Sequence, residues 1–314
     1  MALTKKAGHL ALFVSNLIFG INNPLTRTLI PDVMSPFTLT IFRMLGAALL
    51  FWTASLFVKK EKMSPKDIFK LFFAALFGIV LNQMVFLEGL SMTSPIDASL
   101  VITLLPIVTM ILAAIIIREP ITWLKIIGVL VGACGALILI FNSSASGKTG
   151  NFKGDIIILV STFSFAFYLT MFKDLISKYS PVHTMKWMFL FASLMSYPFC
   201  HSSLVQTNFV MFDAAVWLKI LYVVVLSTFV SYLLIPIGQK TLRPTTLSMY
   251  NYMQPIVASL VTVIIGIDKL TYDNLLSAVL VFAGVYIVTQ SKSKVQLERE
   301  KIKKKQPPAD GHNQ

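Results

Sequence analysis

A run of amide and phenol side chains interrupts an apolar segment near the C-terminal end of the chain, in the sequence Tyr250-Asn251-Tyr252-Met253-Gln254-Pro255. Asn251 and Gln254 are three residues apart, so they share one face of a helix. Pro255 lacks a backbone N–H and leaves the carbonyl of Asn251 without its helical partner. We predict that Tyr250, Asn251 and Gln254 bind a polar, uncharged or zwitterionic solute. The alternative is a structural kink whose free carbonyl is bound by a neighbouring Ser or Thr.

Arg43 is a cation inside another apolar segment. A charge in such surroundings needs a partner. Glu88 and Asp97 are carboxylates expected at the same end of neighbouring segments. We predict a buried ion pair of Arg43 with Glu88 or Asp97, which holds this end of the molecule together or acts as a gate. The alternative is that Arg43 binds a carboxylate of the substrate.

Catalytic and metal-binding patterns are missing from the sequence. It has no Ser/His/Asp or Cys/His set, no glycine-rich phosphate loop and no paired carboxylates in one segment. Its four His and two Cys lack metal-ligand spacing. The basic residues lie in short loops and a tail, without the basic, aromatic face that binds nucleic acid. We expect no enzyme activity, metal, cofactor or nucleic-acid partner.

Most of the chain is one unit that occurs twice. Leu104–Val108 returns as Met253–Val257, and both segments end in Pro-Ile-Val. The same alignment pairs Gly89 with Gly238, Pro95 with Pro244, Glu119 with Asp268 and Gly135 with Gly284, and earlier in each copy Gly8 pairs with Gly154 and Ser15 with Ser161. A proline deep in an apolar stretch bends or opens a helix. We predict that Pro106 and Pro255 are hinges beside a cavity.

Polar side chains occupy matching places in the two copies. Asn22 corresponds to Tyr168, and Asn82 and Gln83 correspond to Ser231 and Tyr232. Carriers built from repeats bind their solute between the copies. We therefore predict that further substrate-binding residues are Asn22, Asn82, Gln83, Tyr168 and Ser231. The alternative is that these groups join packed helices.

The composition indicates that lipid surrounds the chain. Hydrophobic residues make up 56% and charged residues 13% of its 314 residues, and the mean hydropathy is +0.76. An apolar helix of about 20 residues crosses a bilayer. We predict an all-α integral membrane protein with ten transmembrane helices over residues 8–30, 34–58, 67–90, 94–117, 122–142, 154–174, 182–201, 214–238, 245–267 and 271–290.

The order of the spans predicts two inverted five-helix repeats. The first covers residues 1–142 and the second 154–290, with an outer connector at 143–153 and a basic cytoplasmic tail at 291–314. Because five is odd, the second copy enters the membrane from the opposite side. Most of the 27 Lys and Arg residues fall on the side of the termini, which places both termini in the cytoplasm.

The duplicated pattern resembles the EamA-type carriers of the drug/metabolite transporter superfamily over about residues 8–290. The residues that carry the resemblance are Gly89-Leu90, Pro95, Leu104–Val108, Arg118–Thr122 and Gly128–Gly132. The resemblance implies a small-solute carrier, often an exporter of amino acids or other metabolites, which works by alternating access. It places the cavity between spans 1, 3, 4, 6, 8 and 9, with spans 5 and 10 at the periphery.

We therefore predict a secondary transporter of the cell membrane that exports an amino acid or similar polar solute. A membrane-embedded enzyme acting on a lipid-linked substrate would need acids or histidines clustered at a membrane face, and a passive channel would need a continuous polar stripe. Because Ile102 and Leu105 occupy the places of Asn251 and Gln254, polar contacts should come mainly from spans 1, 3, 6 and 9. The small-residue spacing of Gly128–Gly135 is compatible with a monomer or a homodimer.

Overall fold

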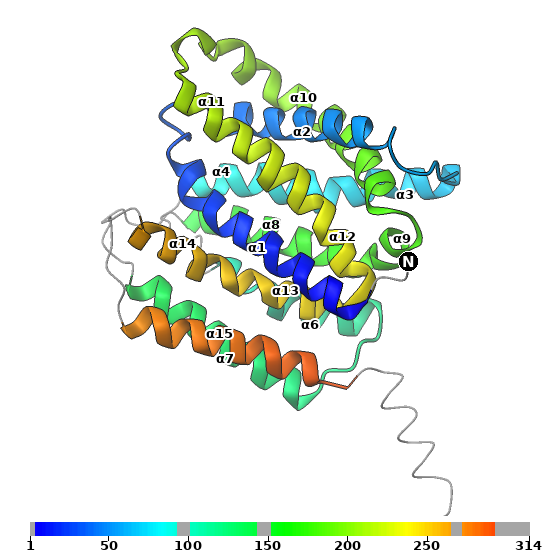
Figure 1. Ribbon diagram of the computed structural model, residues 1–314, viewed down its shortest axis with the longest axis vertical. Helices are drawn as coiled ribbons and strands as arrows, with labels where there is room; N and C mark the ends of the chain where they lie inside the picture. The colour runs from blue at the N-terminus through cyan, green and yellow to red at the C-terminus, as the bar shows by residue number, and fades with distance from the viewer. Residues whose placement is uncertain (1–3, 93–100, 143–151, 265–271, 293–314) are drawn as a thin grey trace, which may run out of the picture.

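The computed structural model describes residues 4–92, 101–142, 152–264 and 272–292, and these residues form helices and connecting turns without any β-strand (Figure 1). The helices of the first half are α1 (Lys5–Arg27), α2 (Pro36–Ala54), α3 (Pro65–Ala75), the π-helix η1 (Leu76–Met84), α4 (Val85–Met92), α6 (Leu105–Ile116) and α7 (Trp123–Asn142). Those of the second half are α8 (Phe152–Met171), α9 (Lys173–Lys178), α10 (Pro181–Gln206), the short 3₁₀-helix η2 (Phe209–Met211), α11 (Ala214–Leu221), the π-helix η3 (Tyr222–Val230), α12 (Ser231–Thr241), α13 (Pro244–Met249), the 3₁₀-helix η4 (Tyr250–Tyr252), α14 (Met253–Ile264) and α15 (Tyr272–Gln290).

Helices α2, α3 and α10 each begin with a serine followed by proline. The hydroxyl oxygens of Ser35, Ser64 and Ser180 accept backbone N–H bonds from the first turn of their helices. The proline at the first helical position has no N–H to satisfy and its φ already suits the helix. This sequence pair therefore fixes the start of three helices.

Five continuous helical segments are long and apolar enough to cross a membrane: Pro36–Ala54, Pro65–Met92, Phe152–Met171, Pro181–Gln206 and Ala214–Thr241. Shorter apolar helices occupy Leu105–Ile116, Trp123–Ile138 and Leu275–Gln290. Large apolar side chains such as Leu49, Ile115 and Phe199 are exposed on their outer surfaces. A membrane supplies the apolar surroundings that such surfaces need.

Two helices in which we predicted a proline bend or opening are interrupted just before their prolines. The predicted span 245–267 consists, in its described part, of α13, one 3₁₀ turn and α14, and the turn Tyr250–Tyr252 directly precedes the helix that contains Pro255. The chain also turns at Thr103 and Leu104, before α6 and Pro106. Proline removes a backbone donor and crowds the preceding helical turn, which explains why both breaks lie just before it.

The two longest apolar segments, Pro65–Met92 and Ala214–Thr241, each contain a nine-residue π-helix in their middle, η1 and η3 respectively. In this wider turn the backbone carbonyl bonds to the residue five positions on. Side-chain hydroxyls follow the same spacing, since Thr228 donates to the Val223 carbonyl and Ser231 to the Leu226 carbonyl. The π-helices place Asn82, Gln83 and Thr228 near the centre of the molecule.

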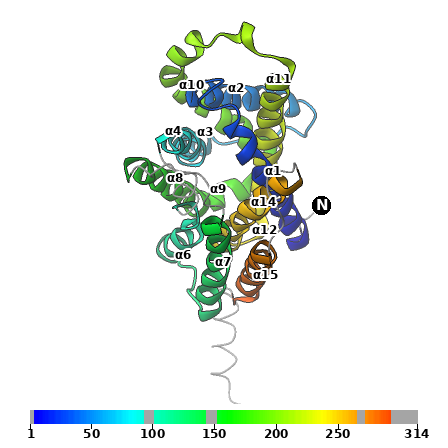
Figure 2. The same cartoon turned by 90° about the vertical axis from the view of Figure 1, so that its left-hand side faces the viewer.

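The helices form a long, layered body in which α2 and α10 pair at one end and α7 and α15 at the other (Figures 1 and 2). Between them, α1 packs against α12 and α14, and α8 packs against α4, η1 and α6. Helices α7 and α15 approach each other closely at their glycines. A Cβ added to Gly128 would lie only 2.8 Å from the Gly284 carbonyl oxygen. The small-residue face of α7 is thus used for packing within the chain.

Candidate substrate-binding site

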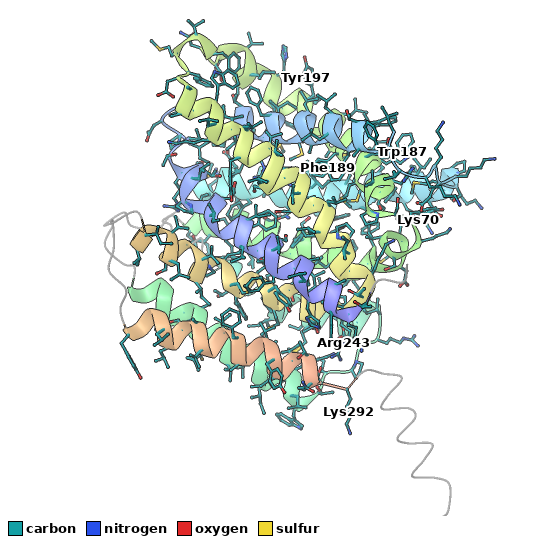
Figure 3. All side chains as sticks on the ribbon, in the orientation of Figure 1. Lys70, Trp187, Phe189, Tyr197, Arg243 and Lys292 are labelled. Carbon is teal, nitrogen blue, oxygen red and sulfur yellow. The ribbon has the colours of Figure 1, made fainter. Side chains whose placement is uncertain are left out.

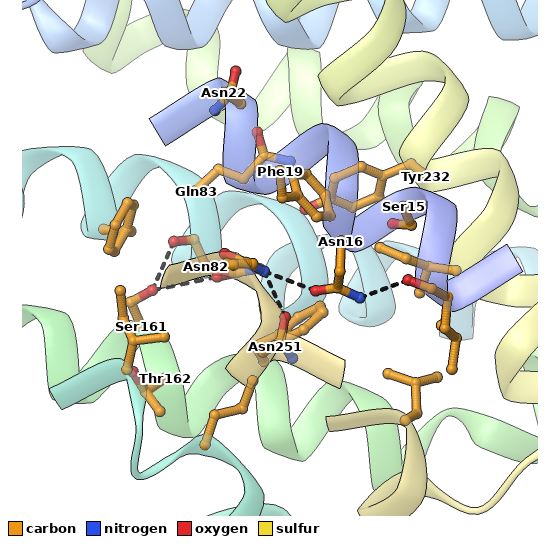
Figure 4. Close-up of a pocket in the computed structure, with 18 of the residues that line it drawn as sticks. Ser15, Asn16, Phe19, Asn22, Asn82, Gln83, Ser161, Thr162, Tyr232 and Asn251 are labelled. Carbon is orange, nitrogen blue, oxygen red and sulfur yellow. Dashed lines mark hydrogen bonds between the residues drawn. The ribbon is translucent and has the colours of Figure 1, made fainter. Parts of the chain in front are cut away.

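A cavity of about 140 Å³ lies between the central helices. This is roughly ten times the space that one buried water molecule needs. Its wall comes from α1, α2, η1, α4, α8, α12, α13, η4 and α14, together with Ile102 and Leu105 at the start of α6 (Figure 4). Both interrupted helices therefore end at this cavity.

One side of the cavity carries a cluster of three amides. The Gln254 Nε2 donates to Asn251 Oδ1 at 2.8 Å and to Asn16 Oδ1 at 3.0 Å. Asn16 Nδ2 in turn donates to the Leu12 carbonyl, and Asn251 Nδ2 donates to the Ser248 carbonyl. Within the described residues no hydrogen bond uses the Gln254 Oε1, which leaves an acceptor on the cavity wall.

A second polar group joins α8 to the π-helix η1. The Ser161 hydroxyl donates to the backbone carbonyl of Asn82 at 2.7 Å and also lies 3.3 Å from its Oδ1 (Figure 4). Ser164 makes a similar 2.7 Å bond to the Phe77 carbonyl. These serines satisfy carbonyls of the widened turn, so they hold Asn82 and Gln83 against the cavity.

Arg43 is a buried cation on the cavity wall, with 6% of its surface exposed. Its Nε donates to the Thr228 hydroxyl at 3.0 Å, and that hydroxyl donates to the Val223 carbonyl. Among the described residues Arg43 forms no ion pair, so the predicted pair with Glu88 is absent from this structure. Glu88 is half-buried and does not line the cavity, whereas Asp97 lies outside the described residues.

Five of the predicted substrate-binding residues come together on the cavity wall: Asn22, Asn82, Gln83, Asn251 and Gln254. The other three do not line it. The Tyr168 hydroxyl donates to Gln239 and the Ser231 hydroxyl to the Leu226 carbonyl. The Tyr250 hydroxyl lies 2.7 Å from His9 Nδ1. Ser231 and Tyr250 each adjoin a residue that does face the cavity, Tyr232 and Asn251, and successive helical residues point in different directions.

The cavity wall also contains polar residues that we did not predict. Ser15 and Asn16 of α1 correspond to Ser161 and Thr162 of α8 in the duplicated sequence, and all four line the cavity. Phe19 and Phe165 form another such pair. The alignment of the two first segments was the signal that could have identified them.

The predicted asymmetry between the copies is visible on the wall. Ile102 and Leu105 line the cavity from one copy, and Asn251 and Gln254 line it from matching positions in the other. The two interrupted helices therefore present different chemistry to the same space.

A charged network lies apart from the cavity, near the ends of the helices. Lys125 is almost fully buried and its Nζ lies 2.6 Å from Glu119 Oε1. Arg243 Nε is 3.8 Å from the same oxygen, and the Thr245 hydroxyl is 3.5 Å from Glu119 Oε2. Arg243 also donates to the carbonyl of Ser291 at the end of α15. The network ties the α6–α7 connection to the start of α13.

Comparison with known proteins identifies the family to which the chain belongs. The model of the EamA-like transporter family matches residues 6–141 and again residues 152–290. An uncharacterized transporter from Archaeoglobus fulgidus is 29% identical over 259 residues, which cover 82% of this chain and 90% of the relative. The uncharacterized transporter YyaM from Bacillus subtilis is 24% identical over 286 residues, covering 88% and 93% of the two chains.

A WAT1-related protein from Arabidopsis thaliana is 22% identical over 296 residues, covering 86% of this chain and 75% of the relative. A protein of known crystal structure superposes with a TM-score of 0.73 at 18% identity, over 92% of this chain and 99% of the other, so the fold is shared. The apolar helices and the transporter relatives identify a multi-pass membrane protein. Because the family model matches both halves and nearly the whole chain, this protein belongs to the EamA-like transporter family of drug/metabolite transporters.

Proposed function

We propose that the chain is a secondary transporter that moves a small solute across the cell membrane by alternating access around the central cavity. The observation that carries this proposal is the position of the cavity, which lies where both interrupted helices meet and where Asn16, Asn251 and Gln254 expose amide groups. Solute sites near the middle of broken helices are typical of transporters built from repeats. Export of a metabolite is the direction that we propose.

We further propose that ten spans form two inverted repeats. Reciprocal contacts support this relation, because a two-fold axis exchanges equivalent positions. A Cβ on Gly89 would lie 2.7 Å from Ile158, and one on its counterpart Gly238 would lie 2.5 Å from Leu12. Leu12 and Ile158 are themselves counterparts in the alignment that pairs Ser15 with Ser161.

The α7–α15 pair supports the same relation. Gly128 faces the Gly284 carbonyl and Gly135 faces the Ser277 carbonyl, each at 2.8 Å from the added Cβ. The alignment pairs Gly128 with Ser277 and Gly135 with Gly284, so the two contacts are exchanged images of one another.

The proposed cytoplasmic face is the side that carries Lys70, Arg243 and Lys292 (Figure 3). Cytoplasmic loops of membrane proteins are rich in Lys and Arg. The Glu119–Lys125–Arg243 network lies at this face and joins the segments that follow α6 and α12. We propose that it closes the cytoplasmic entrance in this conformation, while Pro106 and Pro255 act as hinges.

Counterflow in proteoliposomes tests the transport proposal. Vesicles with the purified chain are loaded with a mixture of metabolites, and uptake of each labelled metabolite is followed. A carrier shows saturable uptake that depends on solute inside the vesicle. Conductance without saturation would instead show a channel, and conversion of an added lipid would show an enzyme.

A further inference from the structure

Arg43 is the one charged side chain on the described wall of the cavity, which includes no Asp, Glu or Lys. Its Nε is bound to Thr228, but no hydrogen bond with the described residues uses its two terminal nitrogens. A buried cation without a counter-ion is unfavourable, above all in a membrane. The cavity itself thus carries a formal positive charge that nothing in the described chain neutralises.

Gln83 adds a second unsatisfied group to the same wall. It is 5% exposed, and neither its Nε2 nor its Oε1 makes a hydrogen bond of normal geometry among the described residues, although the Tyr232 hydroxyl lies near it. Asn22 Oδ1 is also buried without a partner. Figure 4 shows Asn22 and Gln83 on the same side of the cavity. Buried polar groups are normally hydrogen-bonded, so these atoms are available to a bound molecule.

The orientation of the guanidinium is fixed by the π-helix η3. The Thr228 hydroxyl donates its proton to the Val223 carbonyl, so its oxygen is free to accept a hydrogen bond from Arg43 Nε. A guanidinium held through Nε presents its terminal nitrogens as a fork, which matches the two oxygens of a carboxylate. Thr228 is therefore a positioning residue for Arg43.

We propose that the cavity binds a small organic monocarboxylate, whose carboxylate is held by the terminal nitrogens of Arg43 and by Gln83 Nε2. The single positive charge balances one negative charge, whereas a dianion is left with an excess charge. A cation is repelled, and the ammonium group of a zwitterion meets no carboxylate on the described wall. The uncharged part of the solute contacts the amide cluster of Asn16, Asn251 and Gln254 and the apolar wall. This inference rests on the proposed transport function, for which it names the substrate class.

The first test compares acids with their uncharged amides. The thermal stability of the full chain, purified in detergent, is measured with propionate and propionamide, lactate and lactamide, benzoate and benzamide, and with alanine as a zwitterion. A ligand that binds the folded state raises the apparent Tm. We expect at least one acid to raise the Tm by several degrees while its amide leaves it unchanged. If none of the acids raises the Tm, or if the amides act as strongly as the acids, the proposal is wrong.

Variants of Arg43 locate the effect. Arg43→Gln should abolish the shift caused by the acid, and Arg43→Lys should weaken acid binding about tenfold because an ammonium lacks the fork. Arg27→Gln is the matched control, since Arg27 is exposed at the end of α1 and does not line the cavity. It should keep the full shift.

Stability without any ligand separates binding from structure. Arg43→Gln removes an unpaired buried charge, so its Tm without ligand should equal or exceed that of the wild type. If Arg43 only supports the structure through Thr228, Arg43→Gln should have a lower Tm without ligand and an unchanged Tm shift with the acid. That result would overturn the proposal.

Counterflow distinguishes the two proposals. Acid binding that depends on Arg43 without saturable counterflow leaves the anion site in place and contradicts the transporter. Saturable counterflow of neutral solutes, without any for the acids, supports the transporter and contradicts the monocarboxylate.

Discussion

The hydroxyl of Tyr252 donates a hydrogen bond of 3.0 Å to the carbonyl oxygen of Thr103. The two residues occupy the same position in the two copies of the duplicated sequence. Each lies in the turn that precedes a proline-containing helix, α6 or α14. The two interrupted helices are therefore joined directly, at their breaks, beside the cavity.

Replacement of Pro255 by alanine tests the role of this break in transport. Pro255→Ala restores the backbone N–H that can bond to the Asn251 carbonyl and favours a continuous α-helix. We expect solute binding to remain within about threefold of the wild type, while the counterflow rate falls about tenfold or more if the break acts as a hinge.

Pro198→Ala is the control for this change, because Pro198 also lies inside a helix, α10, but is exposed and away from the cavity. It should transport at the wild-type rate. Equal rates for Pro255→Ala and Pro198→Ala would mean that the break is not a hinge.

The amide cluster should contribute to solute affinity. Gln254→Leu and Asn251→Leu replace cavity-facing amides by the type of side chain that Leu105 provides at the position matching Gln254. Loss of one or two hydrogen bonds should raise the solute Kd about tenfold. Binding is measured by calorimetry with a solute identified in the thermal assay, and Leu105→Met, which keeps the apolar wall, is the control. Unchanged affinity in both leucine variants would show that the amide cluster does not bind the solute.

The Glu119–Lys125 pair, buried on both sides, should matter much more than the Asp67–Lys178 pair, whose lysine is exposed. Glu119→Gln leaves Lys125 buried without its counter-ion, which should destabilise the chain by about 3–5 kcal/mol. The Nζ of Lys178 is 2.5 Å from Asp67, but the Lys178 side chain is largely exposed. Loss of such a solvent-exposed lysine should cost at most about 1 kcal/mol, because Asp67 keeps its hydrogen bond from Tyr179. Comparison of the unfolding transitions of Glu119→Gln and Lys178→Met in detergent checks this contrast, and similar losses in both would contradict it.

Close packing of α7 on α15 should not tolerate an added methyl group. A Cβ on Gly284 would lie 2.6 Å from the Gly128 carbonyl oxygen, so Gly284→Ala must move the two helices apart. We expect a loss of about 1–3 kcal/mol, the usual cost of overpacking. Cys134→Ala, at an exposed position on α7, is the control. A wild-type Tm for Gly284→Ala would show that this contact is looser than the structure indicates.

The sequence indicated which segments carry polar groups, but not always which side chain faces the cavity. Asn251 and Gln254 were predictable because Pro255 and a three-residue spacing mark one helix face. The alignment paired Asn82 with Ser231 and Gln83 with Tyr232. Tyr232 lines the cavity as Gln83 does, whereas the Ser231 hydroxyl donates to the Leu226 carbonyl of the π-helix η3. Ordinary helical periodicity of 3.6 residues cannot anticipate such a turn.

Arg43 shows a second limit of sequence reasoning. Its need for a partner was evident, and Glu88 was a reasonable carboxylate to expect. The structure gives it Thr228 instead, a hydroxyl from the π-helix of the other copy. Which groups meet across two packed copies depends on the rotation of each helix, and hydropathy does not encode it.

Ile102 and Leu105 beside one break match Asn251 and Gln254 beside the other, so the two breaks face the cavity with apolar and with amide side chains respectively. Between the two breaks, a solute meets amide groups on the α14 side and aliphatic side chains on the α6 side, so one orientation should be preferred. Stereoisomers that differ in which face meets these amides should therefore bind with unequal affinity.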